Sequence, residues 1–183
     1  MRVVGGSLRG RRILAPEDER VRPTSDRARE ALFNILTQGR QGNVVAEAEV
    51  LDAFAGSGAL GIEALSRGAA FVTFLEQDRA AVRLIAENLK ALGLEARAQV
   101  LLADAMRPPV ARRQASLALL DPPYGSGLGA AALAALATGG WLAPGALATL
   151  EVEKGEAVVP PEGFTLVDER RYGRARIVML KRD

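Results

Sequence analysis

Short apolar segments alternate with amphipathic ones through most of this chain, and this alternation constrains its fold more than any other feature. The apolar runs have the length of strands, and the segments between them place apolar residues three or four positions apart, as helices do. Parallel strands need such helical crossovers, so the pattern predicts an α/β fold with a doubly wound, mostly parallel sheet. The predicted strands cover about 50–55, 70–75, 97–102, 116–120 and 146–153, and the helices about 60–67, 78–92 and 127–137.

Both ends of the chain extend this core. Residues 165–171 and 174–182 predict an antiparallel hairpin, which completes a Rossmann-like sheet of seven strands. Residues 2–14 predict a small β-hairpin, and a helix from about Ser25 to Thr37 follows it. We therefore expect a single domain over 1–183, with an N-terminal hairpin and helix extension in 1–40 and a ligand-binding core in 41–183.

The chain contains no cysteine and no histidine. This excludes disulfides, Cys/His zinc sites and iron–sulfur clusters, as well as Ser-His-Asp and Cys-His catalysis. The chemistry is left to carboxylates, backbone carbonyls, hydroxyls and aromatic faces, and we expect no metal. No apolar run has membrane-spanning length and the first residues are not a secretory signal, so we expect a cytoplasmic protein, and a monomer.

The first predicted strand ends in a bend in which Gly56, Gly58 and Gly61 follow Asp52 and Phe54. Glycines allow a tight turn and a close approach of the backbone to a ligand, although such a spacing also marks dinucleotide sites. A carboxylate four residues before the first glycine suits a cationic group, such as an ammonium, better than a pyrophosphate. We expect Asp52, Phe54, Gly56 and Gly58 to line a cofactor site.

Acidic residues follow the next two strands. Glu76 ends the second strand, where a carboxylate can accept two hydrogen bonds from a ribose diol, and Gln77 follows it. Asp104 follows the third strand and can accept from an adenine amino group, while Ala105 offers its backbone N–H. Because the carboxyl ends of parallel strands meet at one edge of a sheet, these residues predict one cofactor pocket.

The fourth, unusually apolar strand stops at Asp121-Pro122-Pro123-Tyr124. An aryl amine is a poor nucleophile because its lone pair is delocalised into the ring. Two acceptors aimed at its two hydrogens favour a tetrahedral nitrogen, and the Asp121 carboxylate and the Pro122 carbonyl can supply them. Pro123 restricts the backbone that aims this carbonyl, and Tyr124 offers a flat face to a base. The turn predicts methyl transfer to an amino group.

In this order, the glycine bend, Glu76, Asp104 and the proline turn resemble those of class I methyltransferases. The N-terminus narrows the match: residues 2–11 read RVVGGSLRGR and residues 22–34 read RPTSDRAREALFN. These strings resemble the bacterial 16S ribosomal RNA guanine-N2 methyltransferases of the RsmD type over essentially the whole chain. The resemblance implies methyl transfer from S-adenosyl-L-methionine to one guanine N2 amine of 16S rRNA, within an assembled or nearly assembled small subunit.

Arginines give independent support for RNA binding. All but three of the 24 basic residues are arginine, and residues 1–16 contain arginines but no acid. We expect the N-terminal arginines to form a basic lip beside the pocket. A second arginine cluster flanks the terminal turn, and it either binds RNA as well or forms ion pairs with nearby acids. The predicted RNA-binding residues are Arg2, Arg9, Arg11, Arg12, Arg22 and Arg27, with Arg29 beside them, and the C-terminal cluster is Arg170, Arg171, Arg174 and Arg176.

Three other functions remain open at this point. A DNA amino-methyltransferase uses the same turn on adenine N6 or cytosine N4, but it usually carries a further domain that reads the duplex. An NAD-type oxidoreductase would use the glycine bend and Glu76, but it leaves Asp52 and the proline turn without a role. A non-enzymatic RNA-binding scaffold would not need every polar group of the site.

Overall fold

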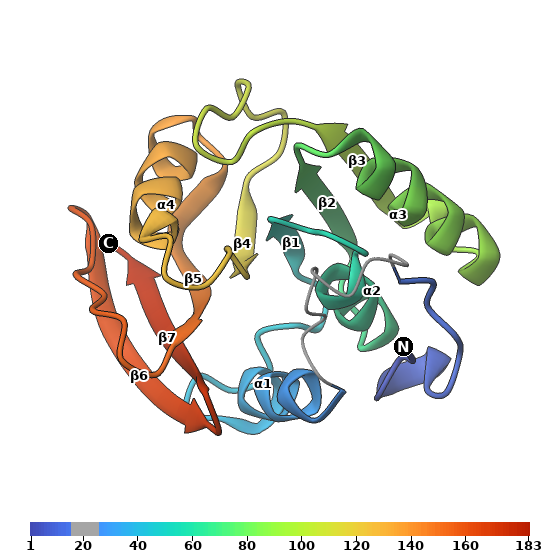
Figure 1. The fold of residues 1–183 in the computed structure, drawn as a ribbon, viewed down its shortest axis with the longest axis horizontal. Coiled ribbons are helices and arrows are strands. Elements are labelled where there is room, and N and C mark those ends of the chain that lie inside the picture. Colours follow the sequence, from blue (N-terminus) through green and yellow to red (C-terminus); the bar gives the residue numbers. More distant parts are fainter. Residues whose placement is uncertain (16–25) are drawn as a thin grey trace.

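The computed structural model describes residues 1–15 and 26–183. Figure 1 shows one twisted sheet with helices on both faces, which runs from β3 at one edge to β6 at the other, in the order β3-β2-β1-β4-β5-β7-β6. The seven strands are β1 Glu49–Ala53, β2 Phe71–Glu76, β3 Ala98–Leu102, β4 Ala115–Leu120, β5 Leu142–Glu153, β6 Phe164–Tyr172 and β7 Ala175–Arg182.

The strand directions confirm the predicted fold class. The first five strands are parallel, while β7 is antiparallel to both β5 and β6, so the chain ends in the expected hairpin. Strand β5 begins earlier than the sequence indicated. The predicted strand covered about 146–153, but the strand already pairs at Leu142 with Ala115 before a register shift.

The helices cover the two faces of the sheet unequally. Of the helices in the described residues, α1, α2 and α3 pack on one face with the apolar side chains of β1, β2 and β4, whereas α4 packs on the other. The segment 103–114, between β3 and β4, contains no helix and covers the rest of this second face as a loop. The helices are α1 Asp26–Gln38, α2 Ala59–Ser66, α3 Arg79–Leu92 and α4 Leu128–Thr138.

Helix α3 shows how local sequence sets these elements. The Asp78 side chain caps its N-terminus by accepting from the Ala80 N–H at 2.9 Å, and Gly93 ends it in the left-handed conformation. Ile85 and Leu89 lie on the buried stripe that packs against the sheet. The predicted bounds of this helix therefore agree with the structure to within one residue.

The predicted N-terminal β-hairpin is present, but its strand pairing is short. The two arms do run antiparallel, and the Val3 N–H donates to the Arg11 carbonyl at 2.9 Å, but only one bridge forms, between Arg2 and Arg12. A 3-10 turn, Gly6–Leu8, joins the arms. The arms form no longer ladder because their polar groups bond to helices instead: Val4 N–H donates to Glu63 of α2.

Candidate active site

The ends of the central strands place the predicted site residues along one edge of the sheet. Ala53, the last residue of β1, pairs with both Leu75 of β2 and Leu120 of β4. The glycine bend after β1 therefore lies between the end of β2 and the proline turn after β4. On the far side of β2, Glu76 pairs with Leu102, the last residue of β3. The four predicted segments are neighbours in space, as the sequence analysis required.

The glycine bend adopts an unusual backbone. Gly56 and Gly58 have φ angles of 55° and 77°, and Phe54 has a φ of 63° although it carries a side chain. Such values are uncommon for residues other than glycine and often mark functional sites. A Cβ atom added to Gly56 would meet no other atom within 4 Å, so the bend opens onto free space. A ligand can approach the backbone closely there.

Asp52 lies beneath this bend and is only 1% exposed. Its Oδ2 atom accepts a hydrogen bond of 2.8 Å from the Gly61 N–H in the first turns of α2. Burial raises the pKa of the Asp52 carboxyl well above its usual range, the Gly61 bond opposes this, and the carboxylates of Asp121 and Glu76 raise it further. Asp121 and Glu76 thus both lie close enough to act on the Asp52 carboxyl, and such a group of acids favours a positively charged ligand.

Glu76 ties the end of β2 to the glycine bend. Its Oε2 accepts from the Gly56 N–H at 2.8 Å, and its Oε1 accepts from the Asp78 N–H at 2.8 Å. A carboxylate has about four lone-pair positions, so both oxygens can accept a further bond from a ligand. Gln77, the next residue, is exposed at the same edge.

Asp104 and Ala105 follow β3 beside Glu76, whose carbonyl accepts from the Ala103 N–H at 2.9 Å. The Asp104 Oδ1 atom accepts from the Met106 N–H at 2.8 Å, which fixes the turn in which Ala105 is buried. The structure therefore places these two residues at the predicted edge, with one Asp104 oxygen used to hold the local backbone.

The proline turn is held by acids that follow it in the sequence. Tyr124 remains 38% exposed, while its hydroxyl donates to the buried Glu151 carboxylate of β5. The Gly125 N–H donates to Glu156 at 3.1 Å. Asp121 is partly exposed at the start of the turn. The turn thus presents one carboxylate and one aromatic face to solvent next to the glycine bend.

The N-terminal arginines lie partly as predicted. Arg2, Arg9, Arg11 and Arg12 are exposed, and Arg27 is exposed on the first turn of α1. Arg11 also donates to the Ala91 carbonyl at 3.2 Å, which holds the segment against α3. Arg22 lies outside the described residues.

The placement of Arg29 in the basic lip is wrong. Arg29 is fully buried, and it pairs with Asp26 at 2.8 Å, donates to the Arg2 carbonyl and lies 3.7 Å from Glu63. Because Glu63 is itself buried inside α2, the arginine neutralises a charge in the core. Its role is to join α1, α2 and the N-terminal segment.

Two residues that connect the site were missed by sequence reasoning. Asn88 of α3 is 1% exposed, and its side chain bonds to both backbone groups of Leu14 and to the Ser57 carbonyl of the glycine bend. It therefore joins the arginine-bearing segment to the bend. The signal was available: an asparagine occupies the apolar stripe of a helix. Glu151, the partner of Tyr124, interrupts the apolar strand β5 in the same way.

The C-terminal arginines are mostly compensated. Arg170 pairs with Asp168 at 3.1 Å, and both Arg171 and Arg176 lie within 4 Å of Glu169. Arg176 also donates to the Glu156 carbonyl. The ion-paired alternative therefore describes this cluster better than an RNA-binding surface does.

A parallel sheet with an antiparallel seventh strand inserted before the sixth, and with acids and a glycine bend along its carboxyl edge, is the arrangement of a class I methyltransferase. NAD-binding folds have the strand order 3-2-1-4-5-6, without this inserted strand. Among the described residues, no group of three or more acids could hold a metal, and no helix is long and apolar enough to cross a membrane.

Comparison with known proteins identifies the family. The model of the family described as "Conserved hypothetical protein 95" matches residues 1–181, so the chain belongs to this family. A relative from Escherichia coli K12, named Ribosomal RNA small subunit methyltransferase D, is 38% identical over 186 residues, which cover 100% of this chain and 90% of that protein. A relative of the same name from Haemophilus influenzae is 37% identical over 177 residues, which cover 94% of this chain and 89% of that protein.

Solved structures agree. The structure of the E. coli methyltransferase candidate yhhF is 36% identical, covers 100% of this chain and 98% of that one, and superposes with a TM-score of 0.84. An RNA methyltransferase from Salinibacter ruber, solved with S-adenosyl-L-homocysteine, shares the fold at 15% identity. The match covers 87% of this chain and 92% of that one, with a TM-score of 0.66. These findings confirm the predicted resemblance and exclude the oxidoreductase and the scaffold.

Proposed function

We propose that this protein transfers the methyl group of S-adenosyl-L-methionine to the exocyclic N2 amine of a guanine in 16S ribosomal RNA. One observation carries the proposal. The strand pairing of Ala53 with Leu120 puts the turn Asp121–Tyr124 directly beside the glycine bend. An amine held by this turn lies next to a methyl donor held by the bend, which is the proximity that methyl transfer needs.

The residues of the bend fit S-adenosyl-L-methionine. The raised pKa of Asp52 reflects a buried carboxyl among other carboxylates, an environment that an ammonium and a sulfonium relieve. The open space over Gly56 admits the methionine part, and Glu76 and Gln77 suit the ribose. Asp104 and the Ala105 N–H suit the adenine. When bound, the cofactor supplies an electrophilic methyl group on a sulfonium.

The proline turn prepares the amine. The Asp121 carboxylate and the Pro122 carbonyl accept from its two hydrogens, which favours a tetrahedral nitrogen with its lone pair directed at the methyl group. These acceptors also stabilise the positive charge that develops on nitrogen. Pro123 limits the backbone freedom of the turn, and the Tyr124 ring, fixed through Glu151, stacks on the guanine. The proton of the methylated amine then leaves to Asp121 or to water.

An RNA substrate is favoured over DNA by two observations. The relatives that match the whole chain are named for ribosomal RNA of the small subunit. The segment that carries Arg2, Arg9, Arg11 and Arg12 is exposed and is joined through Asn88 to the glycine bend. Arginines there contact phosphates around the pocket. We further propose that residues 1–183 act as one domain and as a cytoplasmic monomer on the assembled or nearly assembled subunit.

The test uses small subunits from cells that lack the protein. Purified protein with labelled S-adenosyl-L-methionine is expected to methylate 16S rRNA in these subunits, and nucleoside mass spectrometry is expected to find N2-methylguanosine. Duplex DNA is the comparison substrate. Label on DNA as N6-methyladenine or N4-methylcytosine, with none on RNA, would contradict the proposal.

The arginine segment has its own test. Replacing Arg9, Arg11 and Arg12 with alanine is expected to weaken RNA binding and to lower its salt dependence, because about three phosphate contacts are lost. The matched control replaces the ion-paired Arg170, Arg171 and Arg176, which is expected to change RNA binding less. An equal loss of cofactor affinity in the first variant would show that the segment is structural.

A further inference from the structure

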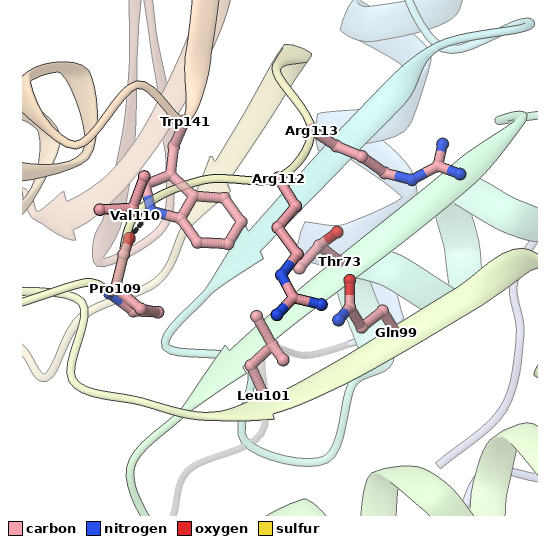
Figure 2. Close-up of a pocket in the computed structure, with 8 residues that line it drawn as sticks. All are labelled: Thr73, Gln99, Leu101, Pro109, Val110, Arg112, Arg113 and Trp141. Atoms are coloured by element: carbon pink, nitrogen blue, oxygen red, sulfur yellow. Dashed lines mark hydrogen bonds between the residues drawn. The ribbon is translucent and has the colours of Figure 1, made fainter.

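A cavity of about 310 Å³ lies on the second face of the sheet, away from the glycine bend and the proline turn. It exists because the loop 103–114 covers β2 and β3 where a helix would otherwise pack. Figure 2 shows Thr73 and Gln99 on the strands that form one side, and Trp141 on the opposite side. Thr73 lies three residues before Glu76, which places it about 10 Å from the carboxyl edge.

Thr73 is a polar residue on a buried strand. It is only 5% exposed, and its hydroxyl makes no hydrogen bond with any residue that the structure describes. Its neighbours on β2, Val72 and Phe74, point to the other face and pack in the core. The Thr73 hydroxyl oxygen is not among the side-chain atoms that are fully buried without a partner, and Thr73 lines the cavity, so this group can bond with an occupant of the cavity. Gln99 adds an amide donor and acceptor beside it.

Arg112 brings positive charge to the same cavity. Figure 2 shows its side chain extending from the loop toward Gln99 and Leu101. Within residues 1–15 and 26–183 it has no ion pair, whereas its neighbour Arg113 pairs with Glu49 at 2.7 Å. The surrounding loop, 105–114, contains three arginines and no acid. The cavity thus combines apolar walls, neutral polar groups and an available guanidinium.

We infer that this cavity binds one unstacked nucleotide of the RNA substrate. The base lies against Trp141 and Leu101 with its polar edge toward Thr73 and Gln99, and Arg112 contacts its phosphate. Single-stranded RNA is recognised in this way, by apolar surfaces, amide and hydroxyl groups, and arginine. The inference rests on the proposed function. An RNA strand is favoured over a free nucleotide because the arginine loop begins at the carboxyl edge itself, directly after Asp104.

The experiment measures the affinity for unmethylated small subunits over a range of salt concentrations. Arg112→Ala is expected to raise the Kd about tenfold and to lower the salt slope by about one. Thr73→Val has nearly the same shape and is expected to raise the Kd about threefold without changing the slope. The matched control is Arg83→Ala, an exposed arginine on α3, which is expected to bind as the unchanged protein does. Cofactor affinity is expected to stay constant in all three.

The outcomes separate this inference from the proposed function. If the unchanged protein methylates RNA and both cavity variants bind like Arg83→Ala, the nucleotide site is overturned while the methyl transfer stands. If no RNA is methylated, the proposed function fails, and the binding series still decides whether the cavity contacts RNA. A separate binding experiment uses guanosine monophosphate as the ligand. Tight binding that Thr73→Val abolishes, with unchanged RNA affinity, would assign the cavity to a free nucleotide and overturn the RNA assignment.

Discussion

Two neighbouring turns at the carboxyl edge are held in place by different means. The glycine bend after β1 is fixed through its backbone: Glu76 accepts from Gly56, and the buried Asp52 accepts from Gly61 at the start of α2. The proline turn after β4 is fixed through a side chain at its end, since the Tyr124 hydroxyl donates to Glu151. The bend therefore has a buried carboxyl beneath it, while the turn leaves Asp121 and Tyr124 partly exposed.

This difference assigns the two turns different tasks. Carboxylates that are buried among other carboxylates lower the stability of the free protein and gain from a bound cation, so the bend determines cofactor affinity. The turn faces a substrate that arrives from solution, and its acceptors act on charge that appears only during the reaction, so it determines rate. Substitutions in the two turns are expected to change different kinetic constants.

The largest effect is expected at Asp121. Asp121→Ala removes one of the two acceptors for the amine and is expected to lower kcat by about 100- to 1000-fold. The Kd for S-adenosyl-L-methionine is expected to change by no more than about twofold, since the carboxylate acts on the amine. Single-turnover methylation and calorimetry measure the two constants. The control is Glu162→Ala, which removes an exposed acid far along the chain.

A comparable loss of cofactor affinity in Asp121→Ala would break the distinction between the turns. It would mean that Asp121 serves mainly as a counter-charge for the cofactor, together with Asp52 and Glu76. The repulsion that Asp121 exerts on Asp52 makes this a real alternative.

Asp52 is expected to show the opposite pattern. Asp52→Asn keeps an oxygen that can accept from Gly61 but removes a buried carboxyl that can ionise. The Kd for S-adenosyl-L-methionine is expected to rise about tenfold, while the free energy of unfolding of the free variant is expected to rise relative to that of the unchanged protein as the pH increases, because the variant has no carboxyl to ionise at this position. Calorimetry and urea denaturation test both changes. A variant that is both less stable and unchanged in affinity would show that Asp52 only supports the fold.

The raised pKa of Asp52 gives the same comparison a pH dependence. Because the folded-state pKa lies above the unfolded one, the contribution of Asp52 to stability is complete below the unfolded pKa and is lost as pH rises through the folded pKa. A cationic ligand binds the ionised form, so cofactor affinity is expected to increase over this same pH range. Asp52→Asn is expected to flatten the increase.

The product analogue sharpens this prediction. S-adenosyl-L-homocysteine keeps the ammonium but lacks the sulfonium charge. If Asp52 pairs with the ammonium, both ligands are expected to show the same pH dependence in calorimetric titrations. If the affinity depends on pH for S-adenosyl-L-methionine only, the sulfonium, and not the ammonium, lies nearest Asp52.

The sequence predicted the core of the molecule well and its connections poorly. Strands β1 to β4 and the site residues at their ends follow from apolar runs that stop at glycines and acids, because the chain direction alone brings such ends to one edge. The burial of Arg29 was not predicted because it depends on which helix packs against α1, and its partner Glu63 lies 34 residues away in the sequence. Asn88 and Glu151 stand out locally as polar residues in apolar segments, but their partners lie in distant segments that no local pattern specifies.

The smallest effect is expected at the contact that fixes the proline turn. Tyr124→Phe keeps the aromatic face but removes the hydrogen bond to Glu151, so the ring is held less firmly. We expect kcat to fall about threefold, the effect of one lost hydrogen bond on positioning. Tyr124→Ala also removes the stacking surface and is expected to cost about tenfold or more in kcat/KM for RNA. If kcat/KM for RNA falls equally in the two variants while cofactor affinity is unchanged, the ring contributes through its anchoring to β5 and not through its aromatic face.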